Sequence, residues 1–364
     1  MRWNLVTDGL SAAALAVSLG CTSHDRAPKL SCSEEGTQCD CGVSIHSNGT
    51  DTSPFGFFVF GDMHSGATEN DLHIVTAVDH MRRIDPSPLA VFSNGDLVDT
   101  GSEAQWADHD RLIASAGWVS QPTCESPIGT PRYFASVGDH DIMSPDWSGV
   151  WNAHLGNELQ QSHDDGVYYS FEVAGALFIV LDSEHVATSG ADEIDRQTLW
   201  LTSVLDASSA SLKFLFFHEP VYPCSSRHEP LAAALPWVDL AERHAANIIF
   251  NSHTHVYSRS CAKLQGGCVG DTAGIVYVET GPVGGVVRDV DVSSGTVTGR
   301  DASGTARTDS YDCTLGKQLR AKAGMQNDFC HVSVRGCTAD VDCYAIDSET
   351  PFDSFSVEGC PRDE

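Results

Sequence analysis

The stretch FVFGDMH at residues 58–64 is an apolar run that ends in two residues able to bind a metal ion, Asp62 and His64. Four more apolar runs end in the same way: FSNGD at 92–96, ASVGDHD at 135–141, FLFFH at 214–218 and IIFNSHTH at 248–255. Short apolar runs are typical of buried strands, and the ends of parallel strands meet at one edge of a sheet. We therefore expect the carboxylates and imidazoles that follow these runs to lie together.

Helical patterns separate the apolar runs, as expected for a layered α/β protein. The predicted strands span residues 56–61, 89–93, 133–137, 167–173, 177–181, 212–217, 247–250 and 274–279. The predicted helices span residues 69–84, 103–116, 194–205 and 230–244. Residues 331–357 alternate well enough between apolar and polar side chains to predict a closing pair of strands.

The composition allows a large globular core and argues against a nucleic-acid partner. Hydrophobic residues make up 41% of the 364 residues, which is ordinary for a folded domain. Acidic residues outnumber Lys and Arg by 50 to 21, and the formal net charge is -29. Because no run rich in Lys and Arg interrupts this acidic surface, we expect a small substrate and no nucleic acid.

The first 21 residues are expected to be an export signal. An apolar stretch at residues 10–19 follows Arg2 and ends shortly before Cys21, and it is too short to cross a bilayer. This order resembles a bacterial lipoprotein signal, so the only membrane attachment that we expect is a lipid on Cys21. The protein would then be periplasmic, anchored in the outer envelope or secreted, with residues 22–50 as a cysteine-containing linker.

The cysteines also indicate an oxidising compartment. Of the 13 cysteines, twelve remain when Cys21 is set aside, and their irregular spacing favours disulfides over the alternative of zinc knuckles. We expect Cys261 to pair with Cys268 and leave the other pairings open. The main domain is expected at 51–358, with a disulfide-rich insertion at about 288–330 and a tail at 359–364. Residues 295–330 are polar and rich in glycine, which favours a long surface excursion.

Three carboxylates and four or five histidines at one sheet edge would suit a pair of divalent cations. Carboxylate and imidazole together bind zinc, manganese or iron. In the D-x-H sequence of Asp62 and His64, residues two apart in an extended segment point the same way. In SHTH the two histidines, His253 and His255, either act together in this manner or serve two neighbouring metals if the loop turns.

The ordered motifs GDMH, GDLVD, GDHD, the single His218 and SHTH resemble the five blocks of calcineurin-like metallophosphoesterases, over residues 56–280. The surrounding text is similar to the purple acid phosphatase branch: YYSFEVAGALFIVLDS at 168–183, FFHEPVY at 216–222, SHTHVYSRS at 252–260 and DSFSV at 353–357. The resemblance implies an α/β fold, a four-layer αββα sandwich in which helices flank two mixed central sheets. It also implies a hydrolase of phosphate mono- or diesters in which a hydroxide bridging two divalent metals, Mn, Zn or Fe, attacks phosphorus.

The resemblance further implies a role for each residue of the motifs. One metal would bind Asp62, His64 and His255, the other would bind Asp139, His218 and His253, and Asp96 would bridge the two. His140 would be the catalytic histidine, which contacts the substrate phosphate or protonates the leaving oxygen. Four residues lie close in sequence to these blocks and either line the substrate pocket or have a structural or supporting role: Glu219, His228, Tyr257 and Arg259. Asp99 is expected to support the ligands or to be structural.

Departures from the family pattern bear on metal and substrate preference. Asp99 stands where the purple branch has a tyrosine ligand, so no charge-transfer colour is expected, and His64 fills a position that has no histidine there. Ser252 replaces a glycine, which we expect to be tolerated. Asp139 replaces an asparagine, and its carboxylate makes the site less positive. We therefore expect diesters to suffer less than monoester dianions.

Two alternatives to a hydrolase remain. One is a catalytically weak metal-binding module anchored in the envelope, supported by Asp139 and the cysteine-rich additions. The other is a structural or adhesive envelope protein held by disulfides, which would bind no metal. The GPVGG sequence at 281–285 lacks the lysine and the helix of a phosphate-binding P-loop, so we interpret it as a turn beside the site.

Overall fold

The structure is a computed structural model, and it describes residues 53–120, 130–156, 161–163, 166–189, 191–223, 230–269, 274–289, 295–300, 306–311 and 314–360. The expected export signal with Cys21, the 22–50 linker, most of the expected tail and His228 lie outside these residues. Within the described ranges, none of the helices combines the length and the apolar character needed to traverse a bilayer.

The strands form two large mixed sheets and two small hairpins. The first sheet contains, in spatial order, β18 (Asp353–Glu358), β17 (Thr338–Ala345), β16 (Asp328–Arg335), β1 (Phe55–Phe60), β2 (Ala90–Asn94) and β3 (Arg132–Ser136). The second contains β15 (Arg320–Gly324), β9 (Tyr257–Ser260), β12 (Val276–Glu279), β8 (Ile248–Asn251), β7 (Leu212–Phe216), β6 (Ala176–Val180), β5 (Gly166–Val173) and β4 (Gln161–His163). The hairpins are β10 (Lys263–Leu264) with β11 (Gly267–Cys268) and β13 (Gly295–Arg300) with β14 (Ala306–Tyr311).

The parallel strands of the two sheets end at the same side of the molecule. In the first sheet β1, β2 and β3 are parallel, and in the second β6, β7, β8 and β12 are parallel. A parallel bridge between Gly61 and Pro282 joins the end of β1 to the end of β12. Loops that follow these strands therefore meet, which is where sites form in open α/β sheets.

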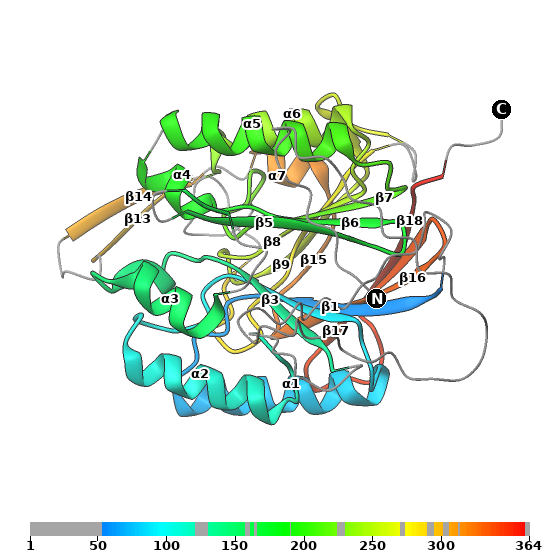
Figure 1. Ribbon diagram of the computed structural model, residues 1–364. Helices are drawn as coiled ribbons and strands as arrows, with labels where there is room; N and C mark the ends of the chain where they lie inside the picture. The colour runs from blue at the N-terminus through cyan, green and yellow to red at the C-terminus, as the bar shows by residue number, and fades with distance from the viewer. Residues whose placement is uncertain are drawn as a thin grey trace, which may run out of the picture.

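Helices cover the outer face of each sheet, so the molecule has four layers (Figure 1). The first sheet is covered by α1 (Thr68–Ile84), α2 (Glu103–Ser115) and α3 (Trp147–Leu155), and the second by α4 (Ser183–Ser189), α5 (Ala191–Ala207) and α6 (Leu235–Arg243). The shorter elements are α7 (Thr314–Leu319) and the 3-10 turns η1 (Asp141–Met143) and η2 (Ala232–Ala234). The four-layer αββα sandwich implied by the resemblance is confirmed.

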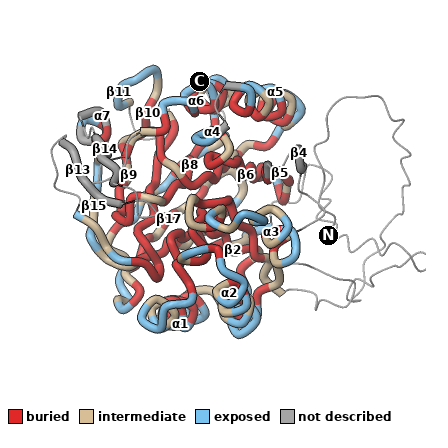
Figure 2. Tube along the Cα trace, turned by 90° about the vertical axis from the view of Figure 1, so that its left-hand side faces the viewer, coloured by how far each residue is buried: buried red, intermediate tan, exposed pale blue. Residues whose placement is uncertain are grey.

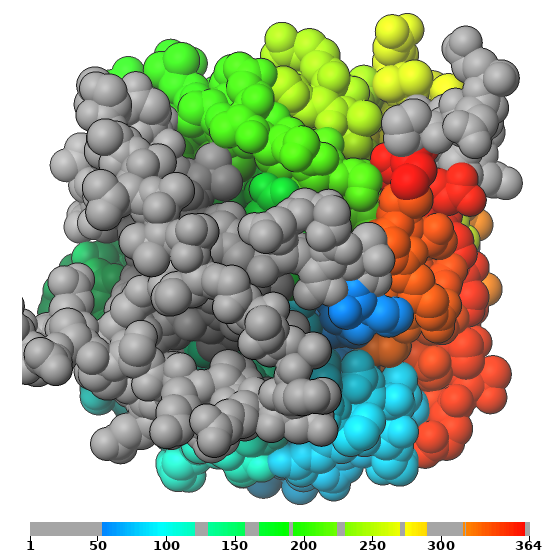
Figure 3. All heavy atoms as spheres, turned by 45° about the vertical axis from the view of Figure 1, so that its right-hand side comes forward, coloured from blue at the N-terminus to red at the C-terminus, as the bar shows by residue number. Residues whose placement is uncertain are grey.

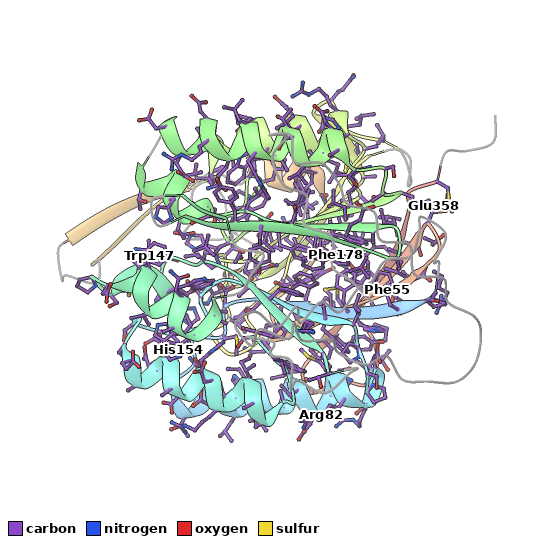
Figure 4. The ribbon with its side chains drawn as sticks, in the orientation of Figure 1. Phe55, Arg82, Trp147, His154, Phe178 and Glu358 are labelled. Carbon is purple, nitrogen blue, oxygen red and sulfur yellow. A yellow bond between two sulfur atoms is a disulfide. The ribbon has the colours of Figure 1, made fainter. Side chains whose placement is uncertain are left out.

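The apolar run in β1 is long because the strand is buried on both faces. Phe57 points into the core between the sheets, where its ring lies 5.2 Å from that of Phe178, centroid to centroid. Phe58 points the opposite way, into the core under the first helical layer. Phe55 also packs on Phe178, and Figure 4 shows both rings between the sheets. Figure 2 shows the same division, with buried strands inside and exposed helix surfaces outside.

The predicted strands and helices exist with small shifts at their ends, but the sequence does not predict α3 or α4. These helices are short, and α3 contains Gly149 and two tryptophans that obscure a helical pattern. The helix predicted at 230–244 begins instead with η2, and α6 starts at Leu235. Pro236 lies in the first turn of α6, where its missing N–H costs no helical hydrogen bond.

The C-terminal region is more regular than expected. Its closing segment forms three strands rather than a pair, and Figure 3 shows the orange and red surface of these strands beside the blue start of β1. The surface excursion expected at 295–330 includes the β13–β14 hairpin, but β15 pairs with β9 and β16 pairs with β1. The end of that segment therefore belongs to the sheets. The RAKAG sequence of β15 gives no strand signal, because this edge strand is largely exposed.

Three disulfides lie among the described residues. Cys261 pairs with Cys268, as predicted. Cys330 and Cys343 join the neighbouring strands β16 and β17, and Cys337 pairs with Cys360 beyond β18. The last two pairs lock the antiparallel strands that extend the first sheet.

Candidate metal centre

Seven side chains predicted to bind metal gather where the parallel strands end. They follow five strands: Asp62 and His64 follow β1, Asp96 follows β2, Asp139 follows β3, His218 follows β7, and His253 and His255 follow β8. They form two overlapping groups whose ligand atoms lie within 4.8 Å of one another. We name Asp62, His64, Asp96 and His255 site A, and Asp96, Asp139, His218 and His253 site B.

Site A brings two imidazoles together, tilted by 50° to each other, beside two carboxylates. The Nε2 atoms of His64 and His255 lie 3.1 Å apart, and His64 Nε2 lies 3.5 Å from Asp96 Oδ2. Asp62 is fully buried, and its Oδ1 accepts a hydrogen bond of 3.0 Å from the backbone N–H of His253. Among the described residues, Asp62 Oδ2 has no hydrogen-bond partner.

Site B is built from the same residue types but opens to solvent. His218 Nε2 lies 3.3 Å from Asp139 Oδ1 and 3.4 Å from Asp96 Oδ1. His253 Nδ1 lies 3.0 Å from His218 Nε2 and 3.1 Å from Asp139 Oδ1. The side chain of His218 is 0% exposed, whereas that of Asp139 is 40% exposed. Solvent can therefore reach site B past Asp139.

Asp96 connects the two sites. Its Oδ1 faces His218 of site B, and its Oδ2 faces His64 of site A. The backbone N–H of His140 donates a hydrogen bond of 2.9 Å to Oδ1, which helps to fix the carboxylate plane. This is the placement that a bridging carboxylate requires.

The SHTH loop turns between its two histidines, so they belong to different sites. His253 lies in site B and His255 in site A, while the Oγ1 of Thr254 donates a hydrogen bond of 2.9 Å to the buried Glu279. The structure thus selects the second of the two arrangements considered from the sequence. Asp62 and His64 do share a site, but not through an extended segment as expected, because both have positive φ.

Backbone strain is concentrated at the candidate ligands. Five of them have φ between 46° and 69°: Asp62, His64, Asp96, His253 and His255. Only three other non-glycine residues in the described ranges share this left-handed conformation, which costs roughly 1 kcal/mol or more per residue. The tightly packed strand ends hold the ligands in this conformation, as is common at functional sites.

Backbone carbonyls fix the orientation of three histidines. Nδ1 of His218 lies 2.6 Å from Asn94 O, Nδ1 of His255 lies 2.6 Å from Val286 O, and Nδ1 of His140 lies 2.5 Å from Asp99 O. Because a carbonyl oxygen only accepts, each Nδ1 must carry the proton that it donates. The Nε2 lone pairs of His218 and His255 are then available to a metal, as in most histidine ligands.

The carboxylates outweigh burial in setting the pKa of most histidines of the centre. Burial acts to lower the pKa of His64, but Asp99, Asp96 and Asp62 together raise that pKa to about 9. Burial also acts to lower the pKa of His218, and Asp96 and Asp139 raise it well above its usual value.

The remaining two histidines differ between the sites. In site B, burial acts to lower the pKa of His253, but Asp139 raises it above the usual range. In site A, burial lowers the pKa of His255, despite the opposing effect of Asp62. Positive charge thus stabilises the carboxylates of the centre, and either protons on the histidines or metal cations can supply it.

The residues fit a pair of divalent cations. The unsatisfied Asp62 Oδ2 and the facing Nε2 atoms of His64 and His255 leave polar atoms directed at a common point in site A. Buried polar atoms of this kind are costly unless a cation or water satisfies them. A mixed nitrogen and oxygen donor set suits zinc, manganese or iron.

His140 and Asp99 lie beside site A. The imidazole of His140 packs edge-on against that of His64, with ring centroids 4.5 Å apart. Oδ1 of Asp99 lies 3.4 Å from His64 Nδ1, so Asp99 supports this candidate ligand from behind, as expected. The side chain of His140 is 29% exposed, which leaves it accessible to a substrate.

Asp141 supports the centre and was not identified from the sequence. One of its carboxylate oxygens accepts from the backbone N–H groups of Leu97 and Val98, and the other from that of Gly138. Burial and the nearby Asp96 raise the pKa of Asp141 to about 7. Asp141 therefore ties the loop after β2 to the loop after β3. A signal was available, since ASVGDHD carries a second aspartate.

A pair of glutamates, the buried Glu184 and the partly buried Glu219, lies behind site B. Glu184 at the start of α4 and Glu219 next to His218 hydrogen-bond to each other, and Ser183 links to both. Burial and Glu219 raise the pKa of Glu184 well above its usual value. Glu219 is thus close to the centre, as predicted, whereas Glu184 was not anticipated.

Tyr257 and Arg259 do not direct their polar groups to the centre. The hydroxyl of Tyr257 donates a hydrogen bond of 2.9 Å to Asp353, and the guanidinium of Arg259 pairs with both oxygens of the same carboxylate. Their expected place beside the substrate is therefore not supported. The reason is that β9 carries them away from the SHTH loop toward β18.

Comparison with known proteins agrees with the fold and the motif order. Residues 55–257 match the family model described as calcineurin-like phosphoesterase. No curated protein matches this sequence significantly. Among solved structures, a purple acid phosphatase from seeds of yellow lupin (Lupinus luteus) has a TM-score of 0.60 and 16% identity, with 86% of this chain and 57% of that chain covered.

Two further solved structures share the fold. An anchor in the inner membrane complex of Plasmodium has a TM-score of 0.56 and 9% identity, covering 85% of this chain and 90% of that one. A dimetal phosphatase from Danio rerio has a TM-score of 0.51 and 13% identity, covering 84% of this chain and 99% of that one. At such low identities the likeness concerns the fold alone.

Proposed function

This chain belongs to the calcineurin-like phosphoesterase family, and from that premise we propose that it is a dinuclear metal-dependent hydrolase of phosphate mono- or diesters. One observation carries the proposal. Side chains that follow five separate strands converge into two ligand groups that share Asp96. Two divalent cations bound there would polarise phosphoryl oxygens and activate water as the nucleophile.

The protein residues would orient the substrate and move protons. We assign the metal ligands as Asp62, His64 and His255 in site A and Asp139, His218 and His253 in site B, with Asp96 between them. His140 holds its Nδ1 proton on Asp99 O, so its Nε2 is left to face the substrate. In the protonated form, His140 would donate from Nε2 to the leaving oxygen or hold a phosphoryl oxygen.

Asp139 would set the preference between substrates. With a carboxylate in place of the asparagine implied by the family resemblance, the centre carries one more negative charge. A phosphate monoester dianion brings more negative charge into the centre than a diester monoanion. We therefore propose that diesters are the better substrates, since the electrostatic penalty for them is smaller.

The assay that tests this function uses p-nitrophenyl phosphate and bis(p-nitrophenyl) phosphate with added Mn²⁺. The wild-type chain should hydrolyse at least one of them, and EDTA should remove the activity. A protein that binds two metal ions yet hydrolyses neither ester would support the alternative, a catalytically weak metal-binding module. That alternative has some support, because a structurally similar Plasmodium protein is described as an anchor.

We also propose that the protein acts outside the cytoplasm. The three disulfides among the described residues would persist in an oxidising compartment. A small phosphorylated substrate would then come from the periplasm or the surroundings, and a lipid on Cys21 would provide the only membrane attachment. Cell fractionation of the wild type and Cys21→Ala tests this. Equal membrane association of both proteins would contradict a lipid on Cys21.

A further inference from the structure

Residues 281–288 form a turn that packs on site A directly after β12. The backbone N–H of Gly285 donates a hydrogen bond of 2.9 Å to the carbonyl of Asp62. The carbonyl of Val286 accepts from His255 Nδ1 at 2.6 Å, and the N–H of Arg288 donates to the carbonyl of His255 at 2.9 Å. Three contacts of the turn backbone thus reach two candidate ligands of site A.

Gly285 lies against both facing imidazoles. A Cβ atom at this position would lie 2.6 Å from Cδ2 of His64 and 3.1 Å from Cε1 of His255. Non-bonded carbon atoms pack best at roughly 3.5–4.0 Å, so any side chain here would have to displace at least one ring. Glycine is therefore required here, because the backbone of the turn approaches both rings closely. A side chain at this position would enter the space that the two rings occupy.

The two rings have little room to yield. His64 is bounded on its other sides by the ring of His140 and by Asp99, and it is buried. His255 is tied to the turn itself through Val286 O. A residue larger than glycine would therefore not be accommodated by movement elsewhere. It would change the 3.1 Å separation of the two Nε2 atoms.

Two residues at the start of β16 hold the turn in place, Asn327 just before this strand and Asp328 as its first residue. Nδ2 of Asn327 donates hydrogen bonds of 3.0 Å to the carbonyls of both Pro282 and Gly285. The buried carboxylate of Asp328 accepts from the backbone N–H of Gly281 at 3.1 Å. Because Asn327 binds two carbonyls of the turn, it fixes the position of Gly285 relative to the imidazoles.

We propose that the 281–288 turn sets the distance between His64 and His255, with Gly285 and Asn327 as positioning residues for a divalent cation in site A. The inference rests on the proposed function in one respect, that the centre binds two metal ions. It adds that site A is assembled by a backbone turn from a distant part of the chain.

The test is the metal content of the full chain after loading with Mn²⁺ and removal of unbound metal. The wild type should retain two ions per chain, and Gly285→Ala should retain one. Gly267→Ala is the matched control, because a Cβ at Gly267 meets nothing within 4 Å. It should retain two ions.

A milder variant covers the case in which Gly285→Ala does not fold. Asn327→Ala removes both hydrogen bonds to the turn but adds no atoms. It should weaken one of the two Mn²⁺ binding steps by about 10–100-fold and leave the other unchanged, as is usual when support behind a metal ligand is lost. A purely structural role would lower the melting temperature without this selective loss.

A double variant shows whether Gly285 acts through site A. Once His255→Ala has removed a ligand of site A, adding Gly285→Ala should change the remaining Mn²⁺ affinity little. Two ions bound with wild-type affinity in folded Gly285→Ala or Asn327→Ala would overturn the inference alone. A wild type that binds no Mn²⁺, Zn²⁺ or Fe²⁺ would overturn the proposed function instead.

Discussion

Sites A and B share Asp96 and use the same residue types, but they are held and covered differently. In site A the ligands are enclosed, with the side chain of His64 only 5% exposed, and a turn from beyond β12 closes over them. In site B the side chain of Asp139 is 40% exposed. Under the proposed function, site A would hold its cation in an enclosed position, whereas the cation of site B would be open to solvent.

The charges behind the two sites differ as well. Asp99, which is half exposed, supports site A, whereas the buried Glu184 and the partly buried Glu219 lie behind site B. Negative charge in a buried position interacts more strongly than at the surface, because water screens it less. Site B should therefore be the side that discriminates between substrates of different charge.

The largest effect is expected when the residue shared by both sites is removed. Asp96→Ala should lower the rate of ester hydrolysis by about 10³-fold or more, because the two-metal clamp supplies several kcal/mol and each 1.4 kcal/mol is tenfold. Kinetics together with metal analysis should show weakened binding at both sites. The control Asp195→Ala, an exposed carboxylate on α5, should behave as the wild type. Normal turnover of Asp96→Ala would refute the shared centre.

A smaller but still large effect is expected for His140, which lies beside site A and which we propose as the catalytic histidine rather than a metal ligand. His140→Ala should lower kcat by about 10²–10⁴-fold, the usual contribution of a positioned acid or base. The backbone N–H that supports Asp96 remains, so two metal ions should still bind. Elemental analysis alongside kinetics separates the roles. Loss of an ion in His140→Ala would make His140 a ligand instead.

Substrate choice should depend on site B. Asp139→Asn keeps an oxygen ligand but removes one negative charge, so it should raise the monoester rate relative to the diester rate by about tenfold. The two nitrophenyl esters report this ratio directly. Glu219→Gln, which removes charge behind the same site, should shift the ratio in the same direction but less. An unchanged ratio in Asp139→Asn would show that its charge does not select substrates.

The smallest effect is expected for Asp328, which holds the 281–288 turn against site A. Burial raises the pKa of Asp328 well above its usual 3.8, so the folded protein holds this proton more tightly than the unfolded chain does. Its stabilising contribution is complete below about pH 3.8 and is lost as the pH rises through the folded pKa.

Asp328→Asn mimics the protonated acid at every pH and keeps an acceptor for Gly281. Its melting temperature relative to the wild type should therefore rise between pH 4 and pH 8, by about 2 °C or more. Thermal denaturation of the metal-free proteins measures this difference. A wild type that gains stability over the variant as the pH rises would contradict the sign.

The sequence predicted those parts of the molecule that strand patterns control. Each buried strand is visible in the sequence as an apolar run. The positions of Asp62, Asp96 and Asp139 at neighbouring strand ends therefore followed from the pattern alone. The division of His253 and His255 between two sites did not follow from this pattern, because it depends on the left-handed turn of the SHTH loop, and only the family resemblance implied it.

Contacts made by backbone atoms and by distant segments were beyond the sequence. The GPVGG turn was predicted to lie beside the site. Its sequence does not show that Gly285 touches two imidazoles or that Asn327 holds the turn. The expectation that Tyr257 and Arg259 lie beside the substrate was not met for a related reason. They are close to His255 in the chain, yet the direction of β9 takes their polar groups to Asp353.

The most direct test of the central claim is anomalous diffraction from crystals of the wild-type protein loaded with Mn²⁺. A two-metal centre that shares Asp96 should give two peaks about 3.5–4 Å apart, one on each side of the Asp96 carboxylate. One peak surrounded by the His64 and His255 imidazoles and another by those of His218 and His253 would assign both sites. A single peak, or manganese bound away from Asp96, would contradict the shared centre.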